Sequence, residues 1–119
     1  MTTMDIPSFA QEWVAGWNAH DLERILVHYA DDVELVSPFV AKLTGSKGSV
    51  RGKAALHDYF ARGQKAFPTV RFELIRTYSG MRSCVLEYHS VNNLRAAELM
   101  EFDGQGKVCR VLAHYTQDS

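Results

Sequence analysis

The segment LRAAELMEF, residues 94–102, places one carboxyl group among apolar side chains. Successive side chains of a strand point to opposite faces, and the face that carries Glu98 otherwise holds alanine, methionine and phenylalanine. We therefore expect Glu98 to point into an apolar interior. Lost hydration would raise the pKa of its carboxyl group, so that it acts as an acid or hydrogen-bond donor near neutral pH.

Two alternatives for Glu98 remain open. The carboxylate could pair with an arginine, for which Arg82 and Arg110 are the candidates. Alternation puts Arg110 on the opposite face and leaves the direction of Arg82 undecided. A slip of one residue in the strand register would instead turn the carboxyl group to solvent.

Other residues are expected to line a pocket together with Glu98. Tyr88 and Tyr115 could bind a ligand oxygen, although a buried tyrosine more often bonds a nearby backbone group. Cys109 is expected on the same face as Tyr115. The full predicted pocket set is Trp13, Trp17, Tyr29, Ser37, Phe39, Tyr59, Phe60, Cys84, Leu86, Tyr88, Met100, Val111, Ala113 and Tyr115.

The histidines and cysteines show no spacing typical of a metal site, so we predict no metal and no cofactor. Histidine titrates near neutrality, but surface or helix-end positions are favoured for His28, His57, His89 and His114. The two cysteines are expected two strands apart, about 10 Å, which is too far for a disulfide.

Helical patterns fill much of the first half of the chain. Asp5 is placed to cap a first helix whose apolar stripe includes both tryptophans. Asp21 is placed to cap a second helix, with Tyr29 on its apolar face and its end at residues 31–32. A third helix is predicted before Pro68, and a glycine inside it, Gly63, indicates close packing.

Strand patterns fill the rest. The first strand covers residues 33–37 and stops at Pro38. Residues 39–51 are predicted to form a mobile loop at the pocket mouth, with a short strand near Val50. Three or four strands follow, with hairpin connections Ser-Gly, Asn-Asn and Asp-Gly-Gln-Gly, over residues 70–78, 82–91, 94–102 and 107–116.

This order predicts a single α+β domain over residues 1–119, in which a strongly curved, mostly antiparallel sheet forms a cone around three helices. Three segments, WNAHDLERILVHYADDVEL, GKAALHDYF and MEFDGQGKV, resemble the SnoaL-like and ketosteroid-isomerase-like group of the nuclear transport factor 2 superfamily. The resemblance runs from Phe9 to Tyr115 and implies the same cone-like fold.

The resemblance also aligns three positions with the catalytic residues of ketosteroid isomerases. Trp13 stands where those enzymes have a tyrosine, Glu98 where they have a protonated aspartate, and Ser37 where they have the aspartate that moves the proton. The Trp13 indole can donate a hydrogen bond. A serine hydroxyl is far too weakly acidic to supply the base, so steroid isomerisation is excluded.

Two functions follow from these residues. The first is an apolar pocket for a small hydrophobic ligand, with no assigned activity. The alternative is an isomerase-, cyclase- or hydrolase-type enzyme that uses Glu98 as acid–base on a polyketide-, steroid- or terpenoid-like substrate.

Charge and hydropathy limit the partners. The chain has 119 residues with 13 basic and 14 acidic side chains, a balance that gives no basic surplus for nucleic acid. No apolar run approaches the ~20 residues of a membrane span, so we expect a cytoplasmic protein. Leu99, Leu112 and His114 on the outer sheet face favour a homodimer.

Overall fold

The strands of the second half form the largest part of one curved sheet. The computed structural model describes residues 5–91 and 94–116. Its strand order is β2-β1-β6-β5-β4-β3, with β1 parallel to β6 and the other neighbours antiparallel. The elements are α1 (Ile6–Asn18), α2 (Leu22–Leu26), β1 (Tyr29–Val36), α3 (Pro38–Thr44), β2 (Ser49–Arg51), α4 (Lys53–Ala66), β3 (Glu73–Gly80), β4 (Ser83–His89), β5 (Arg95–Phe102) and β6 (Val108–Tyr115).

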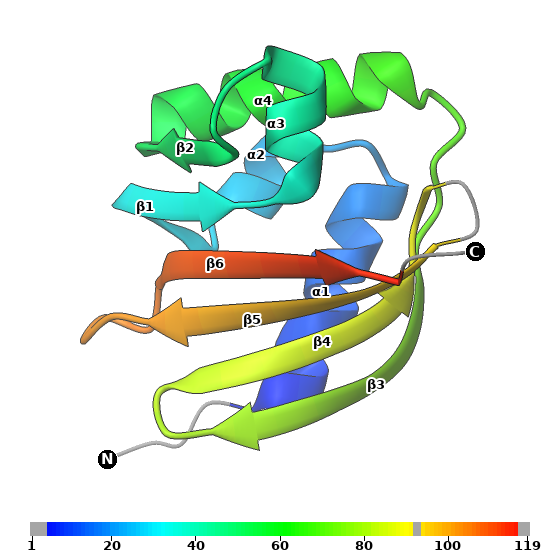
Figure 1. The fold of residues 1–119 in the computed structure, drawn as a ribbon. Coiled ribbons are helices and arrows are strands. Elements are labelled where there is room, and N and C mark those ends of the chain that lie inside the picture. Colours follow the sequence, from blue (N-terminus) through cyan, green and yellow to red (C-terminus); the bar gives the residue numbers. More distant parts are fainter. Residues whose placement is uncertain (1–4, 92–93, 117–119) are drawn as a thin grey trace.

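The helices gather on one side of this sheet, as the α+β prediction requires. Figure 1 shows α1 behind the curved strands, with α3 and α4 beside β1 and β2. Both predicted caps are present, because the carboxylates of Asp5 and Asp21 accept from the backbone N–H groups of Ser8 and Arg24 at 3.1 Å each. No helix in the described ranges is long and apolar enough to cross a membrane.

Two helix predictions are wrong. The second helix, α2, ends at Leu26, and Tyr29 begins β1 instead of lying on the helix. The spacing between Leu22 and Tyr29 is helical, but the two residues lie in different elements. Asp31 and Asp32, which were predicted to end the helix, are exposed residues of β1. Most of the predicted loop after Pro38 is a helix, α3, which Gly45 ends in the left-handed conformation with φ 71°. The short strand predicted near Val50 is present as β2.

The corner between α1 and α2 fixes the start of β3. The side chain of Asn18 donates to the carbonyl of Phe72 at 3.0 Å and accepts from its N–H at 2.7 Å. His20 has φ 55°, and its Nε2 lies 3.2 Å from the carbonyl of Val70. These contacts hold Val70 and Phe72 beside the tryptophans of α1.

The inner face of the sheet is organised in rows that run across the strands. One row pairs Tyr88, Ala96 and Tyr115; the next pairs Leu86, Glu98 and Ala113; the third pairs Cys84, Met100 and Val111. Beyond the third row the register shifts, because Glu101 is opposite Arg110 and Phe102 is opposite Val108. Cys109 is the extra residue of this bulge, so the prediction that it shares the inner face is wrong.

The connections follow the predicted hairpins in part. Asp103 organises the turn after β5, where its Oδ1 accepts from the N–H groups of Gln105 and Lys107 at 2.9 and 3.0 Å. The turn before β4 lies at Met81 and Arg82, two residues after the predicted Ser-Gly. The predicted Asn-Asn connection lies outside the described residues.

Candidate functional site

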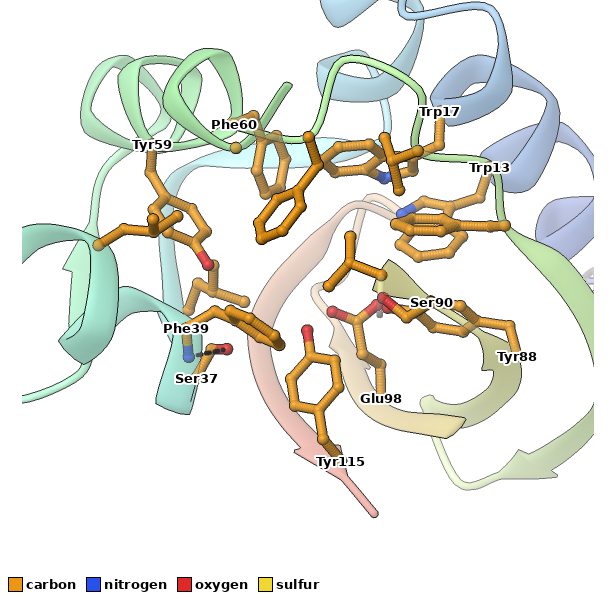
Figure 2. Close-up of a pocket in the computed structure, with 17 residues that line it drawn as sticks. Trp13, Trp17, Ser37, Phe39, Tyr59, Phe60, Tyr88, Ser90, Glu98 and Tyr115 are labelled. Carbon is orange, nitrogen blue, oxygen red and sulfur yellow. Dashed lines mark hydrogen bonds between the residues drawn. The ribbon is translucent and has the colours of Figure 1, made fainter. Parts of the chain in front are cut away.

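A cavity opens between the helices and the inner face of the sheet. Figure 2 shows the rings of Trp13, Trp17 and Phe60 along one side and the oxygen atoms of Ser37, Tyr115 and Glu98 facing them. Its volume is about 80 Å³. The lining consists of Trp13, Trp17, Leu35, Ser37, Phe39, Leu43, Tyr59, Phe60, Gly63, Phe67, Val70, Phe72, Tyr88, Ser90, Val91, Glu98 and Tyr115.

The structure divides the predicted site residues into two groups. Around the cavity lie Trp13, Trp17, Ser37, Phe39, Tyr59, Phe60, Tyr88, Glu98 and Tyr115. The others are buried and do not line it; they are Tyr29, Cys84, Leu86, Met100, Val111 and Ala113. The cavity adjoins the rows of Tyr88 and Glu98, whereas the row of Met100 packs into the core.

Several lining residues were missed from the sequence. Leu35 carried a signal, because it lies two residues before Ser37, a predicted site residue, and alternation puts both on one face. Leu43 lies four residues after Phe39 in α3, a spacing that would have found it had the helix been recognised. The missed residues are Leu35, Leu43, Gly63, Phe67, Val70, Phe72, Ser90 and Val91.

Gly63 does not mark a close contact, contrary to the prediction. A Cβ built at this position meets no heavy atom within 4 Å. The residue lies in α4 and lines the cavity. The absent side chain therefore adds room to the cavity rather than bringing two backbones together.

Glu98 points to the interior, as alternation predicts. It is 7% exposed, and its Oε2 is buried without a hydrogen-bond partner. Burial raises the pKa of the Glu98 carboxyl to about 7, and hydrogen bonding with Tyr88 lowers it by less. Arg110 does not reach it, since that guanidinium lies 3.6 Å from Glu34 and from Glu101 on the outer face. Among the described residues, Glu98 therefore has no ion-pair partner.

Neither of the other two aligned positions can act as in the isomerases. The indole N–H of Trp13 donates to the hydroxyl of Tyr29 at 2.9 Å, so it is not free for a ligand. Ser37 caps α3, and its Oγ accepts from the N–H of Phe39 at 3.2 Å. By contrast, the Trp17 Nε1 is buried without a partner and belongs to a lining residue.

The tyrosines of the cavity remain neutral around pH 7. Burial raises the pKa of Tyr59 to about 12 and places the pKa values of Tyr88 and Tyr115 well above their usual range. Their hydroxyls can donate or accept hydrogen bonds but cannot supply a base near neutral pH. Glu98 is consequently the only described lining residue that can exchange a proton there.

The histidines stand apart from the cavity. His57 is exposed and lies 3.5 Å from Asp58, and His114 is also exposed. His28 is half-buried against the ring of Phe9, and burial lowers its pKa. In the described part of the chain, no three His, Cys, Asp or Glu side chains are grouped to hold a metal ion.

A layer of helices over a curved, mostly antiparallel six-stranded sheet, with a cavity between them, defines a nuclear transport factor 2-like fold. The chain belongs to the SnoaL-like family, since the model of the SnoaL-like domain matches residues 10–118. None of the curated proteins matches the chain.

Solved structures agree with this assignment. A SnoaL-like protein of unknown function from Burkholderia thailandensis is 36% identical, with a TM-score of 0.89 and 93% of each chain covered. A nuclear transport factor 2-like protein from Anabaena variabilis is 18% identical with a TM-score of 0.76, over 99% of this chain and 96% of the other. A provisionally assigned isomerase of the SnoaL-like family from Agrobacterium tumefaciens is 16% identical with a TM-score of 0.74, over 92% and 96%. The last two likenesses show the fold alone.

Proposed function

We propose that the protein binds a small, mainly apolar molecule that carries one polar group. The observation behind this proposal is the buried Oε2 of Glu98, which has no partner and belongs to a cavity lined mostly by aromatic rings. A buried polar atom without a partner costs roughly 1–3 kcal/mol. A ligand that bonds to this oxygen recovers that cost while its apolar part leaves water.

The size of the cavity favours a ligand with one ring. Its volume of about 80 Å³ lies well below the ~300–1,000 Å³ of pockets for drug-sized molecules. A single six-membered ring fits this space better than the fused rings of a steroid. Larger polyketide- or terpenoid-like ligands would need Phe39, Leu43 or Phe67 to move.

Filling the cavity is expected to weaken binding without unfolding the protein. Replacing Gly63 by leucine puts a side chain into the free space beside α4. Benzyl alcohol, titrated while tryptophan emission is recorded, should then bind at least about tenfold more weakly. Both tryptophans line the cavity and report on its occupant.

The matched control is Ala66→Leu, which adds bulk at an exposed position of the same helix. This variant should bind as the wild type does. Equal affinity in Gly63→Leu and the wild type would show that the ligand binds elsewhere.

A second candidate is an enzyme that uses Glu98 for acid–base catalysis, as in an isomerase, cyclase or hydrolase. The supporting observation is the Glu98 pKa of about 7, since a group with this pKa both gives and takes a proton near neutrality. A single carboxyl group of this kind can take a proton from one atom of a ligand and return it to another atom. For a ligand that the protein converts, Glu98→Gln should lower kcat by ~10²–10⁴-fold and leave binding largely intact.

We propose that two copies of the chain associate through the outer face of the sheet. Leu99 and Leu112 lie opposite each other there and are only half-buried. Arg110 contacts Glu34 and Glu101 beside them, which leaves charged groups around an apolar centre. Light scattering should give about twice the 13.4 kDa of one chain. A single-chain mass at micromolar concentration would contradict this proposal.

We also propose a reducing compartment such as the cytoplasm. Cys84 and Cys109 are both free thiols, and Cys84 is buried. Burial raises the pKa of the Cys84 thiol to about 12. A thiol that stays protonated reacts slowly with oxidants. Cys84 therefore has neither a disulfide partner among the described residues nor the reactivity that forming a disulfide requires.

A further inference from the structure

The cavity carries an acidic group without a basic neighbour. Glu98 is the one described lining residue with a charged form near neutral pH, because lysine, arginine and histidine do not occur in the lining. A buried carboxylate normally pairs with a cation, and an unpaired one is strongly destabilised. In the empty cavity Glu98 avoids this cost by keeping its proton up to a pKa of about 7, and a cation brought by a ligand would let it ionise.

The surroundings of Glu98 suit a positive charge. Nine of the 17 lining residues are aromatic, and the faces of such rings attract cations, most strongly in tryptophan. Tyr88 and Tyr115 border the row of Glu98, and Figure 2 shows the hydroxyl of Tyr115 turned toward the cavity. A hydroxyl oxygen accepts hydrogen bonds from an ammonium group, so both rings and hydroxyls can contact the same cation.

We propose that the polar group of the ligand is a protonated amine attached to a single apolar ring, held by the Glu98 carboxylate within the aromatic cavity. The inference rests on the proposed function and names its ligand class. An amine brings the missing charge, places N–H donors toward the unpartnered Oε2 and leaves its ring against Trp13, Trp17 and Phe60. An anionic ligand would meet an uncompensated carboxylate, and a neutral alcohol supplies no charge.

The dependence of binding on pH separates an amine from a neutral ligand. The titratable groups that face Glu98 are Tyr88 and Cys84 from β4, Tyr115 from β6, Tyr29 from β1 and Tyr59 from α4, and α1 contributes only tryptophan. Burial raises the pKa of every one of them, so they stay neutral below pH 9. Glu98 alone changes charge, with a pKa of about 7. An amine, which needs the ionised form, should gain about 30-fold in affinity between pH 5.5 and pH 8.

Calorimetric titration with three single-ring probes of similar size tests the inference. Benzylamine, benzyl alcohol and benzoate are titrated into the purified protein at pH 5.5 and pH 8. At pH 8 benzylamine should bind about tenfold or more tightly than benzyl alcohol, and benzoate should bind most weakly. The affinity for benzyl alcohol should stay level or fall between pH 5.5 and pH 8.

Two variants assign the preference to one carboxyl group. Glu98→Gln should lose the preference for benzylamine and its rise with pH while still binding benzyl alcohol. Glu23→Gln makes the same change at an exposed position of α2 and should behave as the wild type. Benzyl alcohol binding as tightly as benzylamine to the wild type at pH 8 would overturn the amine inference and leave the proposed function standing. Failure of all three probes to bind would overturn both.

Discussion

Replacing Trp13 by alanine is expected to lower the free energy of unfolding by about 3–5 kcal/mol, the cost of truncating a fully packed aromatic residue. Trp13 is 1% exposed, stacks on Phe72 with ring centroids 5.7 Å apart and meets Tyr88 at 5.2 Å. Its indole N–H also satisfies the buried hydroxyl of Tyr29. Urea denaturation followed by circular dichroism measures the loss.

Trp13→Phe separates the packing of the ring from the hydrogen bond. Phenylalanine fills most of the space but leaves the Tyr29 hydroxyl without its donor, which should cost roughly 1–3 kcal/mol. A loss below about 1 kcal/mol in the alanine variant would mean that α1 does not anchor the sheet.

The stability of the wild type is expected to contain a contribution from Glu98 that falls as the pH rises. Below the ordinary value of 4.5 the carboxyl group is protonated in both states. Between 4.5 and about 7 it is protonated only in the folded state, so the unfolded state binds fewer protons and stability decreases with pH. The shift corresponds to about 3 kcal/mol of stability lost by pH 8.

Glu98→Gln should remove this loss. The informative quantity is the difference in unfolding free energy between variant and wild type, because exposed carboxylates and His28 titrate equally in both. We expect the difference to move in favour of glutamine by about 3 kcal/mol between pH 4 and pH 8. Glu23→Gln, at an exposed position of α2, should show no such trend. A constant difference for Glu98→Gln would show that the carboxyl group is hydrated in the folded protein.

The position of Glu98 could be predicted because it depends on local alternation. One strand with apolar residues at every second place has a single register that buries them, and the register observed is that one. The α+β class and the two helix caps were equally predictable, since Asp5 and Asp21 act on residues three positions away.

Long-range contacts decided what the sequence could not show. Tyr29 accepts its hydrogen bond from a residue 16 positions earlier, and Cys109 leaves the inner face because of a bulge in the pairing of two strands. Neither fact has a local signature. The helix α3 was missed because Pro38 was interpreted only as the end of a strand, whereas proline is equally suited to the first turn of a helix.

The extent of the cavity depends on such contacts as well. Val70 and Phe72 join its wall because Asn18 and His20 hold the start of β3 at the end of α1. Gly63 belongs to it because nothing packs against that side of α4. Sequence patterns give the direction of a side chain, but the volume left between elements is set by how closely those elements approach.

The place of β6 in the sheet has a consequence for synthesis on the ribosome. It is made after the five other strands of the described sheet, yet it lies between β1 and β5 and joins the two parts of the sheet. Until residues 108–115 leave the exit tunnel, the β1–β2 hairpin has no neighbour and the inner faces of both parts stay exposed. The domain therefore gains its cooperative fold only after β6 has been made, and in the interval its open strand edges are natural binding sites for a chaperone.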